Sequence, residues 1–181
     1  MKMNKSIALL VSLVLVLTIT IVGSLAYLVA DSVEVKNVFD PSRVTTTVDE
    51  TIKDKVKSDV SIKNTGDIDA YIRAAVVVTW QDENGNVYGS APVLDEDYTI
   101  TWGTEWDRET TDGYYYWPSE VAPDANTGIL ISEAKLAENA AVPDGYFLCI
   151  EIIGSGIQSV PTSVVEENWD VTVADDGTIS K

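Results

Sequence analysis

Carboxylates are the side chains of this chain that could hold a metal ion, because the sequence has no histidine and a single cysteine. They include two closely spaced pairs, Asp67 with Asp69 and Asp95 with Asp97. Carboxylate oxygens are the hard ligands that Ca²⁺ takes in proteins. The two pairs are therefore the candidate calcium ligands, and no other cofactor is expected.

The missing histidines also limit catalysis. Serine-type triads and histidine–cysteine pairs need an imidazole base, and zinc proteases use paired histidines on a helix. The single cysteine, Cys149, lies in the apolar run Tyr146–Ile153 and is expected to be a small core side chain. The sequence therefore predicts no catalytic residues and a protein that is not an enzyme.

Aromatic residues are concentrated between positions 102 and 117. Trp106, Tyr115 and Trp117 could form a surface on which a glycan or a peptide stacks. Strand alternation would place neighbouring aromatic side chains on opposite faces, so at most half of them could share one surface. The alternative, which we prefer, is that these rings fill the core and pair across strands, since aromatic residues are common in strands.

The first thirty residues have the layout of an export signal. A basic start precedes the uncharged run Ile7–Val22, and the small residues Ser24 and Ala26 stand where a signal peptidase requires them. Cleavage between Ala26 and Tyr27 would leave residues 27–181 as the mature protein, working outside the cytoplasm. The alternative is an uncleaved membrane anchor, because residues 6–30 carry no charge and about 20 apolar residues can span a bilayer.

The charge of the chain restricts its partners. The whole sequence has 29 acidic and 12 basic residues, a net charge of −17. The predicted signal contains two of the lysines and no acid, so the mature protein would have a net charge of −19. Nucleic acids and anionic membrane surfaces would be repelled. Membrane contact is therefore expected only through the signal segment, if it is retained.

The elements that must position these residues are mostly strands. Period-two alternation and β-branched residues, interrupted by turn residues and prolines, predict a single all-β domain of residues 27–181. Its expected fold is a jelly-roll or Greek-key sandwich with one or two short helices. The expected strands are 33–39, 43–49, 55–64, 70–81, 98–102, 113–117, 128–132 and 146–158.

Two local features complete the expected fold. Ser163 and Glu166 have the spacing of a capping box, which predicts a helix through Trp169, and a second short helical turn is expected around 132–139. Arg73 stands in the otherwise apolar strand 70–81, so we expect it to form an ion pair with an acidic residue.

Three segments carry a resemblance to a known family: GSLAYLVADSVEVKNVF (Gly23–Phe39), SIKNTGDIDAYIRAAVVVTW (Ser61–Trp80) and GYFLCIEIIGSGIQSVPTSVVEENW (Gly145–Trp169). They resemble the TasA/camelysin (CalY) family, exported proteins of Gram-positive bacteria that share a dedicated SipW-type signal peptidase. Residues 89–127 match only loosely. Camelysin has been described as a metalloprotease, but this chain lacks the paired histidines of ordinary zinc proteases.

The resemblance implies a secreted jelly-roll subunit that self-associates into biofilm-matrix fibres in the matrix or at the cell surface. In such fibres the mature amino-terminal segment, here residues 27–39, is added as a strand to the neighbouring subunit. Alternating Val33 and Val35 would set the register, and Val38 and Phe39 would anchor the far end. Two alternatives remain open. The segment could pair within its own fold, and the protein could be a monomeric binding module that uses the aromatic surface.

Overall fold

The computed structural model describes residues 42–107 and 110–181. All the described residues belong to one compact unit, Pro41–Lys181. The predicted cleavage site (Ala26, Tyr27) and donor-strand residues (Val33, Val35, Val38 and Phe39) lie outside them. Within the described ranges, no helix is both long and apolar enough to cross a membrane.

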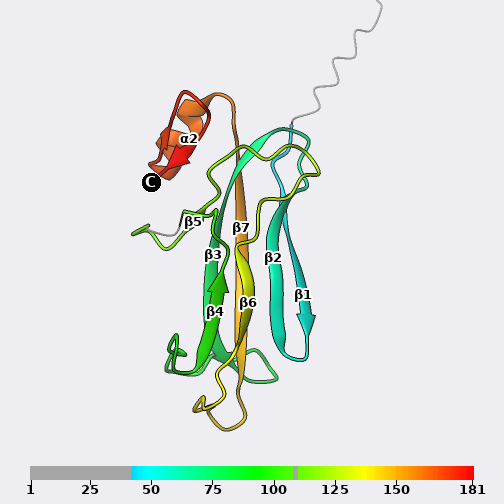
Figure 1. Cartoon of the computed structure of the whole chain (residues 1–181), viewed down its shortest axis with the longest axis vertical. Helices are drawn as coiled ribbons and strands as arrows, with labels where there is room; N and C mark the ends of the chain where they lie inside the picture. Colours follow the sequence, from blue (N-terminus) through cyan, green and yellow to red (C-terminus); the bar gives the residue numbers. More distant parts are fainter. Residues whose placement is uncertain (1–41, 108–109) are drawn as a thin grey trace, which may run out of the picture. The chain divides into compact units, whose positions relative to one another are not determined.

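The larger of the two main sheets has four antiparallel strands (Figure 1). Its order, β1-β2-β6-β4, is not the order of the sequence. The central strand β6 pairs with β2 on one side and β4 on the other. The strands are β1 (Thr46–Lys53), β2 (Val56–Asn64), β6 (Ile131–Leu136) and β4 (Tyr98–Trp102).

The smaller sheet has the order β5-β3-β7, with β5 at Tyr115–Tyr116, β3 at Ala70–Gln81 and β7 at Phe147–Gln158. Strands β3 and β7 are antiparallel along their whole length, from the pair Ala70 and Gln158 to the pair Gln81 and Phe147. No register shift interrupts this ladder. It forms the longest continuous strand pairing of the described residues.

Consecutive strands from β2 to β7 alternate between the two sheets, which produces the non-sequential strand order found in Greek-key sandwiches. The expectation of an all-β sandwich is confirmed. Its core lies between the sheets, where Ile72 and Ala74 of β3 pack with Val60, Ile62 and Ile131 of the larger sheet. Residues at alternate positions of each strand supply these contacts, as period-two alternation requires.

Two glycines of β7 let the first strand approach closely. A Cβ atom at Gly156 would lie 2.7 Å from Cγ1 of Val44, and one at Gly154 would lie 3.1 Å from Cγ2 of Ile62. A side chain at Gly156 would collide with the segment that leads into β1, and one at Gly154 would press on Ile62 of β2 and on Thr46 at the start of β1. Glycine therefore brings β1 against the inner face of β7 and closes this corner of the sandwich.

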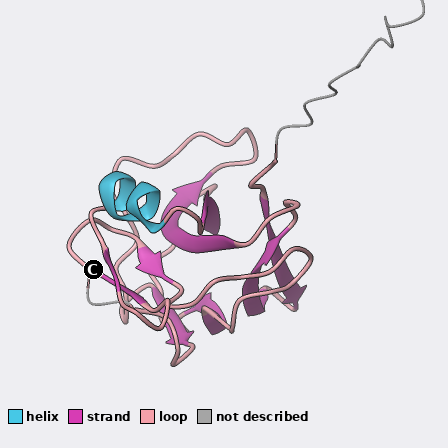
Figure 2. Cartoon of the chain, turned by 90° about the horizontal axis from the view of Figure 1, so that it is seen from above, coloured by secondary structure: helices cyan, strands magenta, loops and turns pink. Residues whose placement is uncertain are grey.

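A small carboxy-terminal unit covers one end of the outer face of β3. It consists of helix α2 (Thr162–Trp169) and a two-stranded ladder of β8 (Thr172–Val173) with β9 (Ile179–Ser180). The helix lies beside the ends of the sheets (Figures 1 and 2). Val165 and Trp169 pack with Tyr71 of β3, which is completely buried.

The predicted capping box is wrong. The N-cap residue is Pro161, and no side chain caps the helix, because α2 begins two residues earlier than a cap at Ser163 would place it and Ser163 lies within its first turn. The Glu166 carboxylate instead accepts a hydrogen bond from the backbone N–H of Val173, at 3.2 Å. This contact joins α2 to β8.

The second expected helical turn, around 132–139, is also wrong, because residues Ile131–Leu136 form strand β6. Their alanine, glutamate and lysine content is typical of a helix, but pairing on both sides with β2 and β4 determines a strand. The strands predicted at 70–81 and 98–102 match β3 and β4. The strand predicted at 43–49 begins at Thr46 and extends to Lys53.

Candidate functional site

Strand β7 is an unprotected edge of the smaller sheet. It pairs with β3 on one side, and in residues 42–107 and 110–181 no other backbone-to-backbone hydrogen bond reaches Phe147–Gln158. Natural edge strands are usually short, bulged, covered, or protected by proline and lysine. This strand is twelve residues long and regular, and its sequence, FLCIEIIGSGIQ, contains neither proline nor lysine.

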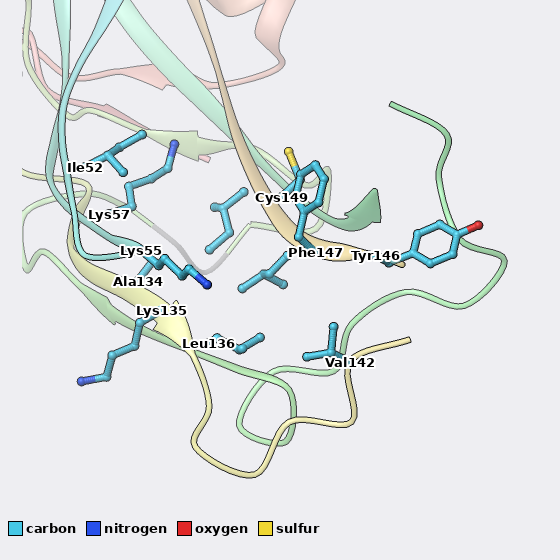
Figure 3. Close-up of a pocket in the computed structure, with 12 residues that line it drawn as sticks. Ile52, Lys55, Lys57, Ala134, Lys135, Leu136, Val142, Tyr146, Phe147 and Cys149 are labelled. Carbon is cyan, nitrogen blue, oxygen red and sulfur yellow. The ribbon is translucent and has the colours of Figure 1, made fainter. Parts of the chain in front are cut away.

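A groove runs along this edge, between β7 and the β1–β2 hairpin. It consists of two adjoining hollows of about 620 and 530 Å³, and both are lined by Lys57 and Ile150. The first hollow lies at the Phe147 end of the strand (Figure 3). The second lies further along, beside Ile152 and Ile153. The groove therefore follows the unpaired side of β7 for about half of its length.

The groove exposes large apolar side chains to solvent. Ile153 is 54% exposed, Phe147 is 48% exposed, and Ile52 of β1 is 66% exposed. Leu136 and Val142, which line the first hollow, are 40% exposed each. Clusters of exposed apolar residues beside an unpaired backbone are typical of surfaces that bind another chain or a ligand.

Three lysines line the first hollow. Lys57, whose side chain is 14% exposed, forms an ion pair with Glu50 at 2.6 Å, and Lys135 forms one with Glu133 at 2.7 Å. Lys55 differs from them, since the described part of the chain offers its ammonium no ion-pair partner. Figure 3 shows the Lys55 side chain extending across the hollow, whereas that of Lys135 points away from it.

A tight turn places Lys55 over the hollow. Lys53 and Val56 are paired, so Asp54 and Lys55 form a two-residue hairpin loop, with φ angles of 51° and 66°. Both angles lie in the left-handed region, where asparagine and glycine are normally preferred. The turn connects β1 to β2 within the space of two residues, and it holds Lys55 at the tip of the hairpin.

Cys149 also lines this hollow, and it is half-buried rather than part of the core. Burial raises the pKa of its thiol above the usual value, and the nearby Glu151 carboxylate adds to the effect, whereas Lys57 opposes it. The thiol is therefore protonated at neutral pH and is a poor nucleophile. The expectation of a core cysteine is wrong, because alternation places Cys149 on the outer face of β7, paired with Thr79 of β3.

The carboxylates predicted to bind calcium have structural hydrogen bonds. Asp67 accepts one from the backbone N–H of Arg43 at 2.6 Å, and Asp97 accepts one from the backbone N–H of Val93 at 2.9 Å. Asp69 and Asp95 use backbone atoms to bond Ser159 and Tyr98. Residues 42–107 and 110–181 contain no group of three or more acidic, histidine or cysteine side chains suited to a metal ion.

The predicted ligand surface is largely part of the core. Trp106 is 4% exposed, its ring lies 5.8 Å from that of Trp117, and its indole N–H donates to the backbone carbonyl of Gly128 at 3.0 Å. Tyr115 is half-buried, and its ring lies 4.8 Å from that of Trp102. These contacts agree with the alternative prediction, in which the rings fill the core and pair across strands.

Arg73 has aromatic partners in place of the predicted carboxylate. Its guanidinium carbon lies 3.9 Å from the ring centroid of Tyr114 and 4.7 Å from that of Trp169. One guanidinium nitrogen donates to the hydroxyl of Tyr116 at 3.4 Å, and that hydroxyl donates to Asp112 at 2.7 Å. The Nε atom is buried without a hydrogen-bond partner among the described residues.

No family model, curated protein or solved structure matches this chain. The resemblance to the TasA/camelysin family therefore stays a prediction. Sequence reasoning missed this edge because strand order depends on pairings between distant segments. The signals that the sequence did contain were the length of the apolar run at 146–158 and its freedom from proline and lysine.

Proposed function

We propose that this chain is an exported structural subunit that self-associates by strand addition into a surface fibre or biofilm matrix of a Gram-positive bacterium. The observation that carries the proposal is the unprotected edge of β7, twelve residues long and without a register shift. An edge of this kind is a template for a strand from another chain. The export signal and its SipW-type peptidase belong to the same proposal.

Strand addition would satisfy the backbone groups that β7 leaves unpaired. In an antiparallel sheet, successive residues direct their hydrogen bonds to opposite sides, so about six of the twelve residues of β7 direct theirs away from β3. An added strand would accept and donate these bonds and would also cover Phe147 and Ile153. Backbone pairing supplies affinity in this mode, and the hollows beside alternate side chains supply register.

The proposed donor is segment 27–39 of a neighbouring subunit. Val33 and Val35 alternate as a strand requires, and Val38 and Phe39 are large enough to occupy a hollow of the groove. Ser42, the first described residue, lines a further hollow together with Gln158, the last residue of the acceptor strand β7. The competing arrangement is one in which this segment pairs with β7 of its own subunit.

Two variants test the proposal by electron microscopy of the protein beginning at Tyr27, in salt concentrations that screen its net charge. Ile153→Lys places a charge at the groove, and Val77→Lys is its control. Val77 is also exposed and lies on the same face of the sheet, but on the central strand β3. We expect filaments from the unchanged protein and from Val77→Lys, and monomers from Ile153→Lys.

Deletion of residues 27–38 completes the test. The deleted protein should remain folded and monomeric, and it should be incorporated at filament ends as an acceptor that cannot extend them further. Filaments formed equally well by the deleted protein or by Ile153→Lys would contradict strand addition at β7. A donor strand that pairs within its own subunit would give monomers of the unchanged protein at every concentration, which would also contradict the proposal.

A further inference from the structure

The hollow at the Phe147 end of β7 has the dimensions and lining of a small-molecule site. Its volume of about 620 Å³ lies within the range of ligand pockets, and most of its lining side chains are apolar. The lining comes from the β1–β2 hairpin, the end of β6, and the segment that leads into and begins β7. The hollow therefore does not depend on a single mobile side chain.

The charge at this hollow is opposite to that of the protein. Three of the twelve basic residues of a chain with net charge −17 line it. Two of them, Lys57 and Lys135, are neutralised by Glu50 and Glu133. Lys55 has no ion-pair partner among the described residues, so one positive charge extends over the apolar lining without a carboxylate beside it (Figure 3).

We propose that this hollow binds a free carboxylate amphiphile, such as a medium-chain fatty-acid anion, with its apolar chain against Leu136 and Phe147 and its carboxylate at the Lys55 ammonium. A long lysine stem lies easily along apolar surface while its ammonium stays at the boundary with water. A ligand with one negative charge and one apolar chain matches both parts of the lining. A cationic amphiphile is excluded by Lys55, and a polyanion is repelled by the acidic remainder of the surface.

This inference does not rest on the proposed function, although the two concern neighbouring parts of one strand. Lys57 and Ile150 line both hollows of the groove, so a bound amphiphile would occupy one end of the edge to which a strand would be added. The proposal is tested by ligand binding alone, and assembly is not its readout.

The only cysteine of the chain provides a reporter at the site. Because Cys149 lines the hollow, the rate at which a maleimide alkylates it in the full chain measures access to the hollow. The measurement uses dilute protein and decanoate below its micelle-forming concentration. We expect decanoate to slow alkylation several-fold with saturation. Dodecanoate should reach half-protection at a concentration roughly ten times lower, because it buries two more methylene groups.

A matched pair of variants identifies the lysine that binds the carboxylate. Lys55→Gln and Lys53→Gln each remove one positive charge from the same hairpin, but only Lys55 lines the hollow. Glutamine at position 55 meets the same positive φ as lysine, so the backbone cost is unchanged. Lys55→Gln should raise the half-protecting decanoate concentration about threefold to fivefold, and Lys53→Gln should leave it unchanged. Decanol, which lacks the carboxylate, should protect all three proteins equally.

Three outcomes would overturn the proposal. The first is alkylation that decanoate does not slow in the unchanged protein, with thermal unfolding confirming that each variant is folded. The second is an equal effect of the two lysine substitutions, which would show only the influence of net charge. The third is protection that increases with protein concentration and ignores decanoate, because it would assign the hollow to a second copy of the chain.

Discussion

The guanidinium of Arg73 lies against the ring of Tyr114, 3.9 Å from its centroid, although 41 residues separate the two in the sequence. Trp169 of α2 also lies within cation–π range of the same guanidinium. One cation therefore connects the central strand β3 with the segment before β5 and with the carboxy-terminal helix. This contact explains how a short helix without a side-chain cap is held on the sheet.

Replacing Arg73 with lysine should loosen this carboxy-terminal unit. An ammonium keeps the charge but loses the planar stacking and the fixed hydrogen-bonding geometry of the guanidinium, so Arg73→Lys should cost about 1–2 kcal/mol of unfolding free energy. Urea unfolding measures the loss, and limited proteolysis should show earlier cleavage between β7 and Lys181. A variant as stable and as resistant as the unchanged protein would show that stacking is unimportant here.

The hydrogen bond from the Tyr116 hydroxyl to the Asp112 carboxylate should make the free energy of unfolding depend on pH. Burial opposes ionisation of this carboxyl, but hydrogen bonds from the Tyr116 hydroxyl and the Tyr114 backbone N–H, with help from Lys181, lower its pKa below the ordinary value of 3.8. An aspartate whose pKa is lower in the folded state stabilises the protein above the unfolded pKa. That contribution disappears as the pH falls through the folded pKa.

Tyr116→Phe should therefore cost about 1–2 kcal/mol at pH 7, and the difference from the unchanged protein should shrink below about pH 3.8. Urea unfolding at pH 7 and pH 3 gives the two differences. Tyr88→Phe is the control, because Tyr88 is an exposed tyrosine elsewhere in the chain. A Tyr116→Phe loss that is the same at both pH values would remove Asp112 from the explanation.

The two glycines of β7 should differ in their tolerance of alanine. A Cβ at Gly156 would stand 2.7 Å from Val44, whereas the nearest atoms at Gly154 would be 3.1 Å away. Gly156→Ala should therefore cost about 1–3 kcal/mol through overpacking, and Gly154→Ala should cost less. Thermal unfolding of the two variants gives the comparison. Equal losses would indicate that the entrance to β1 can shift freely.

Trp106→Ala should act on stability and not on binding. Removing this buried ring leaves a cavity and takes from the Gly128 carbonyl one of its two hydrogen bonds, the other coming from the Thr127 hydroxyl. A cost of about 3–5 kcal/mol is therefore expected from urea unfolding. Tyr88→Ala, at an exposed ring, should change stability by much less. If Trp106→Ala stayed fully stable but lost retention on a cell-wall glycan column, the binding-module alternative would regain its support.

Local pattern alone predicted much of the sandwich. The strand at 70–81 is recognisable because it is rich in β-branched and other apolar residues, and both of its limits agree with β3. The run at 146–158 was placed to within one residue for the same reason. In these segments the intrinsic preference of the residues and the tertiary structure favour the same conformation.

The errors arose where distant partners decide the structure. Residues 131–136 resemble a helix by composition, and only their pairing with β2 and β4 makes them a strand. An ion pair was expected for Arg73 because its aromatic partners, Tyr114 and Trp169, are remote in sequence. The free edge of β7 was missed for the same reason, because the sequence does not show which strands become neighbours.

The uninterrupted ladder of β3 and β7 has a mechanical consequence. At one end of the ladder the chain enters β3 from Asp69 and leaves β7 at Ser159, whose backbone N–H bonds the carbonyl of Asp69 at 3.1 Å. Tension applied through these two connections would pull the strands apart sideways and break the backbone hydrogen bonds between β3 and β7 one after another. Tension applied parallel to β7, through its unpaired edge, would load many of these hydrogen bonds in shear. In that geometry they must break together. The same sheet should therefore yield to a small force in one direction and resist a much larger one in the other.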